Sequence, residues 1–192
     1  MTSKERVLRT FAHQEPDRVP INYSANADID RRLKEHFNLE PNDSQGLHEA
    51  LRVDFRGVSA PYRGPRLHED IPERGVKVDN WGIHRRWIGH DTGGYWDFCD
   101  FPLRNAGEET VANWPMPLPD DHDYSGLREA CERCEKYAVH VGGAGLGCII
   151  NTAGFSRGME QVFVDLVLDE PAGLLLIDRF LEIQLEVTRR TL

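Results

Sequence analysis

The sequence predicts an α/β fold in which parallel strands are separated by helices. Three short segments are strand candidates, namely "RVPINYS" (18–24), "VDFRGV" (53–58) and "AVHVGG" (138–143), and helical patterns lie between them. Strands that alternate with helices along a chain pair in parallel. The chain has 192 residues, of which 40% are hydrophobic, enough for one domain with a sizeable core.

The helices are predicted from apolar periodicity and capping residues. Thr2 and Glu5 form a capping box for a helix over 2–12, and apolar residues at i, i+4 and i+8 predict one over 27–37. Further helices are expected over 43–52, 123–137 and 156–169, and from Pro171 onward. The apolar face of the last is expected at Leu174, Ile177, Leu181 and Leu185. The chain ends without a helix stop signal, as though within this helix.

Residues 59–122 have a different composition, with proline and glycine punctuation and short aromatic runs such as "VDNWGIHRRWIG". We expect a long insertion that contains a β-hairpin and belongs to the single domain 1–192. A connection of that length in a compact unit usually carries function.

Composition argues against several classes of protein. The net charge of −9 has the wrong sign for binding a phosphate backbone, so we expect no nucleic-acid partner. No apolar run is long enough to span a membrane, and we expect no membrane partner. Four cysteines in 192 residues indicate free thiols in a reducing compartment, which favours a cytoplasmic location.

The stretch "VHVGGAGLGCIINTAGFSRGMEQVF" (139–163) contains six glycines. Neither phosphate-binding glycine motif fits it, because Cys148 stands where the next glycine or the lysine is needed. "GFSRG" matches a G-x-S-x-G elbow, but no histidine follows Ser156 to act as its base. We therefore expect Ser156 to be the N-cap of a helix.

Two other motifs are interpreted as structural features and not as functional sites. Cys131 and Cys134 form a single C-x-x-C within a helical pattern, with no second pair at zinc-ligand spacing. The acidic run around His122 is expected to be an exposed loop and helix cap, although it could bind a cation weakly.

Five segments, in order, resemble the uroporphyrinogen decarboxylase superfamily, and most closely its cobalamin- and coenzyme M-methyltransferase-like branch. They are "SKERVLRTFAHQEPDRVPI", "LHEALRVDFRGV", "DNWGI", "WPMPLPDDHDYSGLREA" and "SRGMEQVFVDLVLDEP". The resemblance spans nearly the whole chain. It implies a partial (β/α)8 TIM barrel, the N-terminal half, because a complete barrel takes roughly 250 residues.

The sequence also differs from the family pattern at several positions. Where decarboxylases carry an arginine-rich segment that grips substrate carboxylates, this chain reads "NYSANADI". Their catalytic aspartate and active-site tyrosine fall near Pro61 and Ala153. In the methyltransferase branch, zinc is bound by His-x-Cys and a distant Cys, which belong to a later half of the family chain, so we expect no metal ligands here.

The function expected is therefore that of a fragment of a superfamily enzyme related to corrinoid-dependent methyl transfer, inactive alone. The alternatives are a uroporphyrinogen decarboxylase of porphyrin biosynthesis and a non-catalytic half-barrel that pairs with another chain. No cofactor is expected in this chain, whereas zinc or a corrinoid protein partner is implied for a full-length member. Self-association or a C-terminal half-barrel partner is also expected.

The candidate substrate-binding residues lie after the predicted strands or in "DNWG", and no catalytic residue is assigned. They are Asn22, Tyr23, Tyr62, Arg63, Asp79, Trp81, Gly143, Gly145, Asn151 and Arg157. The two glycines are included because the resemblance places their loop at the substrate face of a barrel.

Overall fold

The computed structural model describes residues 1–91, 93–141 and 149–192. It divides the chain into two compact units. Unit 1 comprises Met1–Val58 and Leu127–Val141, and unit 2 comprises Ser59–Gly126 and Gly142–Leu192.

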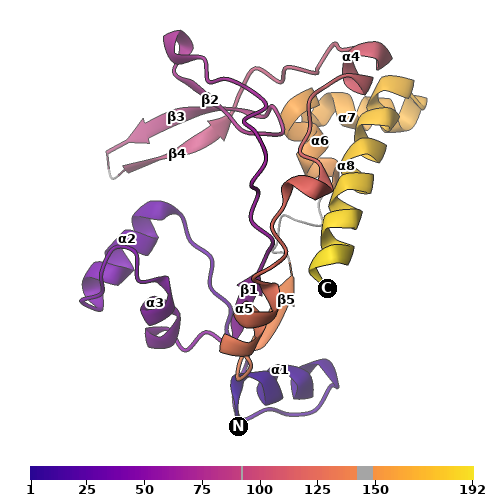
Figure 1. The fold of residues 1–192 in the computed structure, drawn as a ribbon. Coiled ribbons are helices and arrows are strands. Elements are labelled where there is room, and N and C mark those ends of the chain that lie inside the picture. The colour runs from indigo at the N-terminus through magenta and orange to yellow at the C-terminus, as the bar shows by residue number, and fades with distance from the viewer. Residues whose placement is uncertain (92, 142–148) are drawn as a thin grey trace. The chain divides into compact units, whose positions relative to one another are not determined.

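Unit 1 contains a two-stranded parallel sheet and four helices, seen in the lower part of Figure 1. The helices are α1 (Ser3–Phe11), α2 (Ala27–His36), α3 (Ser44–Ala50) and α5 (Leu127–Arg133). Strand β1 (Phe55–Val58) pairs in parallel with β5 (Ala138–Val141), with Phe55 opposite Ala138. The prediction that these two segments pair in parallel is confirmed.

Side-chain caps begin the first three helices. The predicted capping box of α1 is present, because the Thr2 hydroxyl accepts from the Glu5 N–H and the Glu5 carboxylate accepts from the Thr2 N–H. Asn26 caps α2 and Asp43 caps α3 in the same way, each through its side-chain oxygen. These local signals explain why the predictions of α1, α2 and α3 agree with the structure, whereas the helix expected over 123–137 is present only as α5.

Segment 18–24, the expected first barrel strand, is not a strand. The Ile21 N–H donates to the buried Asp54 carboxylate at 2.8 Å instead of to a neighbouring strand. Arg6 and Arg18 donate to the same carboxylate at 2.6 and 2.7 Å. A side-chain network therefore holds the segment where a sheet was expected.

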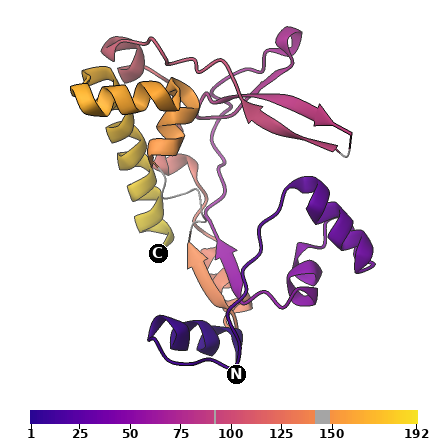
Figure 2. The same ribbon diagram turned by 180° about the vertical axis from the view of Figure 1, so that it is seen from behind.

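Unit 2 combines a three-stranded antiparallel sheet with a group of helices. The strands β2 (Val76–Val78), β3 (His84–His90) and β4 (Gly93–Phe98) are in the order β2-β3-β4, after the 3-10 turn η1 (Pro72–Arg74). In Figures 1 and 2 the β3–β4 ribbon extends away from the helices of this unit. The hairpin predicted within 59–122 is present and gains β2 as a third strand.

The helices of unit 2 enclose its core. They are α4 (Glu108–Ala112), the 3-10 turn η2 (Pro119–Asp121), α6 (Ile149–Arg157), α7 (Met159–Leu168) and α8 (Pro171–Thr191). On α8, Ala172, Leu176 and Phe180 are buried at i, i+4 and i+8. The predicted apolar face of α8 is thus displaced, since Leu181 and Leu185 are exposed.

The helix expected over 156–169 is divided in two at Gly158, whose φ of 87° favours glycine. Ser156 consequently lies near the end of α6, buried, with its hydroxyl donating to the Ala153 carbonyl at 3.1 Å. The prediction that Ser156 is an N-cap is wrong, because the residue at the N-cap of α7 is Gly158.

The prediction of a partial (β/α)8 barrel is also wrong. The described residues form five strands, two in a parallel sheet and three in an antiparallel sheet, and no (β/α)8 barrel is evident. A barrel needs successive parallel strands, and among the strands that the structure describes only β1 and β5 pair in parallel.

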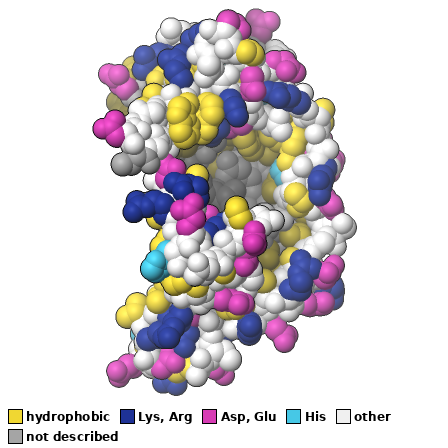
Figure 3. Space-filling model, turned by 90° about the vertical axis from the view of Figure 1, so that its left-hand side faces the viewer, with side chains coloured by type: hydrophobic (Ala, Val, Ile, Leu, Met, Phe, Trp, Pro, Cys, Tyr) yellow, Lys and Arg dark blue, Asp and Glu magenta, His cyan; other side chains and the backbone are white. Residues whose placement is uncertain are grey.

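Two properties of the surface bear on partners. On the face shown in Figure 3, basic and acidic side chains are interspersed, and apolar side chains lie between them. None of the helices within the described ranges has both the length and the apolar character needed to cross a membrane.

Candidate functional site

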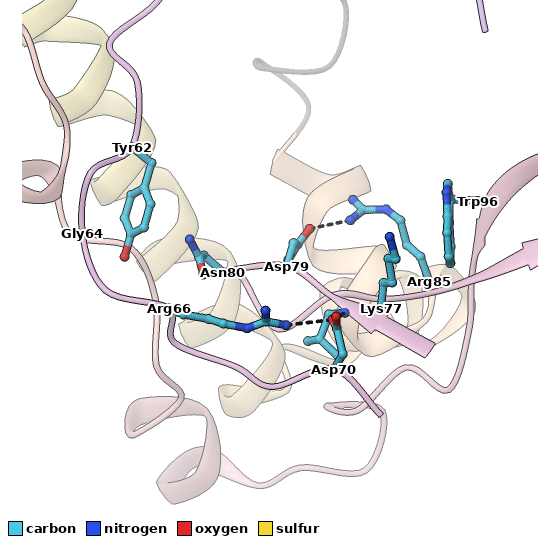
Figure 4. A pocket seen from close by; sticks show the side chains of 10 residues that line it. Tyr62, Gly64, Arg66, Asp70, Lys77, Asp79, Asn80, Arg85 and Trp96 are labelled. Atoms are coloured by element: carbon cyan, nitrogen blue, oxygen red, sulfur yellow. Dashed lines mark hydrogen bonds and ion pairs between the residues drawn. The ribbon is translucent and has the colours of Figure 1, made fainter. Parts of the chain in front are cut away.

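The candidate site is a cavity of about 660 Å³ in unit 2. This volume is within the range of small-molecule sites. Its walls come from the loop before β2, the β2–β3 turn and the face of the sheet, as Figure 4 shows. The lining residues are Tyr62, Gly64, Arg66, Asp70, Lys77, Val78, Asp79, Asn80, Arg85 and Trp96.

Asp79 organises the turn between β2 and β3. One carboxylate oxygen accepts from the backbone N–H groups of Trp81 and Ile83 at 2.9 and 3.0 Å. The other accepts from Arg85 at 2.7 Å. Both oxygens are therefore used, one to fix the turn and one to direct the Arg85 guanidinium along the cavity wall (Figure 4).

Asp70 has a similar role on the opposite side. Its carboxylate accepts from the Val78 N–H at 2.8 Å and pairs with Arg66 at 2.9 Å. The Val78 N–H, followed by the Arg66 guanidinium, holds the pKa of Asp70 below its ordinary value. Asp70 is thus an ionised anchor of β2 and not a proton-transfer group.

The sheet contributes Lys77, Arg85 and Trp96 to the cavity. Lys77 is directly opposite Arg85 in the β2–β3 register, so both side chains lie on the same face. The Lys77 Nζ lies 4.8 Å from the centroid of the Trp96 ring. Arg85 is packed at 5.1 Å over Phe98, which itself stacks on Phe155 of α6. This stacking joins the Phe98 end of β4 to α6.

Tyr62 closes the far side of the cavity. Its hydroxyl donates to the Pro65 carbonyl at 2.7 Å, and its ring packs edge-on against His122 at 5.5 Å. Burial, followed by the charge of Asp121, raises the pKa of the Tyr62 hydroxyl. Tyr62 therefore remains a neutral phenol at neutral pH.

Of the residues predicted from sequence, the cavity brings together Tyr62 and Asp79. Arg63 borders a smaller adjoining cavity of about 170 Å³ with Asp120–Asp123. Asn151 is exposed on α6 and does not line the cavity. Gly143 and Gly145 lie outside the described residues.

The other predicted residues have local structural roles. Trp81 packs on Phe180, and its carbonyl accepts from the Trp114 indole at 3.0 Å. Arg157 is buried and bound to Asp165. The Asn22 side-chain oxygen accepts from the N–H of the next residue, and Tyr23 donates to Asp30, both within unit 1.

Eight of the ten lining residues were not predicted from sequence, namely Gly64, Arg66, Asp70, Lys77, Val78, Asn80, Arg85 and Trp96. Lys77 could have been found from the sequence. In "VKV" it stands between two apolar residues, the alternation typical of a strand with one buried face. The register that places Lys77 beside Arg85 depends on a non-local pairing that the residue pattern leaves open.

The described part of the chain contains no group of three or more His, Cys, Asp or Glu side chains arranged to hold a metal ion. Cys131 on α5 and Cys134 just beyond it are partly exposed free thiols. The zinc implied for the family therefore has no ligand set among these residues.

In comparisons with protein-family models, curated proteins and solved structures, no match to this chain was found.

Proposed function

We propose that this chain supplies a small-molecule-binding part of an enzyme related to the methyl-transferring branch of the uroporphyrinogen decarboxylase superfamily. The five ordered sequence segments support the relationship, and the barrel is not part of the proposal. One structural observation carries the binding role: a cavity of about 660 Å³ into which Tyr62, Asn80, Lys77, Arg85 and Trp96 converge.

The cavity has the composition of a binding site. Small-molecule sites combine aromatic surface with a few converging polar groups that fix the ligand's orientation. Here Trp96 supplies the aromatic surface, and Lys77 and Arg85 supply hydrogen-bond donors beside it.

The same contacts favour holding a substrate over reacting with it. Both carboxylates of the cavity, Asp70 and Asp79, already accept backbone N–H groups and pair with arginines. These contacts use both carboxylates to hold the loop and the sheet together, which gives them a structural role in the cavity wall. We therefore propose that the chain alone binds a methyl donor or acceptor without turnover.

Zinc has no role in the proposed binding, since the described residues provide no ligand set for it. A corrinoid would belong to a partner protein, as the sequence resemblance implies. The proposal keeps the cytoplasmic location that the few cysteines suggest.

The test is ligand-observed NMR of the purified chain with methylated amines, methyl thioethers and methoxyaromatic compounds. We expect saturable binding of at least one class, weakened by Trp96→Leu. The matched control is Tyr95→Leu, because Tyr95 is the adjacent aromatic residue on β4 and successive strand residues point to opposite faces.

Anaerobic assays for methylcobalamin and coproporphyrinogen accompany the binding experiment. We expect neither product from the chain alone. Coproporphyrinogen above the uncatalysed background would replace the proposal with the decarboxylase alternative. Failure of every donor class to bind would support the non-catalytic alternative instead.

A further inference from the structure

The sheet face that lines the cavity carries two cations opposite each other. Lys77 and Arg85 are partners in the antiparallel β2–β3 register. Like charges in directly opposite positions destabilise a strand pair. Asp79 neutralises Arg85 at 2.7 Å, whereas no ion pair within the described ranges joins Lys77 to a carboxylate. Lys77 is thus the cation of this wall that lacks a bound anion.

The residues that line the cavity carry a surplus of one positive charge; Glu69, which pairs with Arg66 at 3.6 Å, is not one of them. Arg66, Lys77 and Arg85 supply three cations, and Asp70 and Asp79 supply two carboxylates. Each carboxylate pairs with an arginine, so the surplus belongs to Lys77. A ligand with one negative charge would balance it, whereas several buried carboxylates would exceed it.

An aromatic surface lies beside this charge. Trp96 lies two positions from Phe98, the partner of Arg85, and so shares the face of Lys77 and Arg85. The Trp96 residue is 40% exposed, and its indole stands next to the Lys77 ammonium in Figure 4. A ligand whose anionic group pairs with the Lys77 ammonium could therefore place an attached flat apolar group against the Trp96 indole.

We propose that the cavity binds an aromatic monocarboxylate, with the carboxylate between Lys77 and Arg85 and the ring against Trp96. The carboxylate supplies the negative charge that Lys77 lacks and forms charge-assisted hydrogen bonds with both cations. The ring gains contact with the indole in an offset or edge-on arrangement. This inference rests on the proposed function only in taking the cavity as a substrate site.

The experiment measures the affinity of benzoate and of benzamide, its uncharged counterpart of similar shape, by isothermal titration calorimetry. The test variant is Lys77→Gln, because Lys77 is exposed and its removal leaves no buried carboxylate unpaired. The control is Arg86→Gln, which removes a cation from the other face of β3, where Arg86 lies near Asp100. Circular dichroism checks that each variant folds.

We expect benzoate to bind more tightly than benzamide. Lys77→Gln should weaken benzoate binding about tenfold, as expected for one charge-assisted hydrogen bond. Arg86→Gln should leave both affinities unchanged, and Lys77→Gln should leave that of benzamide unchanged.

Equal affinities for benzoate and benzamide, both unaffected by Lys77→Gln, would overturn the recognition of a carboxylate. If benzoate does not bind but a methyl donor binds in a Trp96-dependent manner, this inference fails and the proposed function stands. If neither benzoate nor any methyl donor binds, both fail.

Discussion

Arg157 and Asp165 form a buried ion pair that joins α6 to α7. The Asp165 carboxylate is fully buried and accepts from the Arg157 Nε and Nη2 atoms. Arg157 also donates to the carbonyls of Leu103 and Ala106 at 2.8 and 2.9 Å, which fixes the chain before α4. A residue selected from sequence as a binding group is therefore the central polar contact of unit 2.

Replacing Arg157 should destabilise the chain strongly. Arg157→Met leaves the Asp165 carboxylate buried without a cation, and we expect a loss of about 3–5 kcal/mol in the free energy of unfolding. Arg189→Met is the control, because Arg189 is 70% exposed in its pair with Glu186 and its replacement should cost far less stability. Urea denaturation measures both, and equal losses would show that the buried pair is not structural.

The Asp54 network should make stability depend on pH. Burial acts to raise the pKa of Asp54, but hydrogen bonds from Arg18, the Ile21 N–H and Arg6 outweigh burial and lower it. The hydrogen bond from Arg6, which outweighs burial, likewise lowers the pKa of Asp17 to about 2. A lowered pKa in the folded state means that the unfolded chain takes up protons first as the pH falls.

The contribution of these carboxylates is therefore complete above their ordinary pKa of 3.8 and is lost as the pH falls below it, in the case of Asp17 through a pKa of about 2. We expect the free energy of unfolding to decrease over this window. Asp54→Asn should lower stability at pH 7 and flatten the decrease. Urea titrations at pH 7, 4 and 3 measure the free energy of unfolding. If it falls with pH as steeply in the variant as in the wild type, the role of Asp54 is refuted.

The elements that the sequence predicted correctly are those stabilised by contacts between residues close together in the chain. The capping box of Thr2 and Glu5 involves residues three apart, so the start of α1 could be located from four letters. Segment 18–24 has the composition of a strand, yet its Ile21 N–H is bound by Asp54, 33 residues away. No local pattern reveals such a partner.

The candidate site was predicted only in part for the same reason. Tyr62 and Asp79 were selected because they stand in loops near strands or motifs. Lys77 and Arg85 meet through the β2–β3 register, and Trp96 joins them through β3–β4. Register sets which side chains share a face, and an error of one residue would separate all three.

Ser156 should not react as a nucleophile. It is fully buried within α6, and its hydroxyl donates to Ala153. A fluorophosphonate probe should leave the chain unlabelled, and Ser156→Ala should cost about 1 kcal/mol or less through the lost hydrogen bond. Stoichiometric labelling that disappears in Ser156→Ala would contradict this account.

An apolar stripe on α7 should cause self-association. Phe163, Val164, Val167 and Leu168 are exposed, with Val167 at 80%. Exposed apolar patches favour association with another copy. Sedimentation velocity should show a mass that increases with concentration in the wild-type chain and less so in Val167→Glu. Thr188→Glu, an exposed position on α8, is the control, and a wild-type monomer at all concentrations would contradict the prediction.

The most direct test of the cavity as a ligand site is a two-dimensional NMR titration of the four tryptophan indole N–H signals with benzoate. We predict a saturable shift of the Trp96 signal. At the same benzoate concentration the shift should be much smaller in Lys77→Gln, where binding is about tenfold weaker, and unchanged in Arg86→Gln. The Trp114 signal, whose N–H is bound to the Trp81 carbonyl, should stay in place. An unmoved Trp96 signal, or shifts that are equal in both variants, would contradict the account.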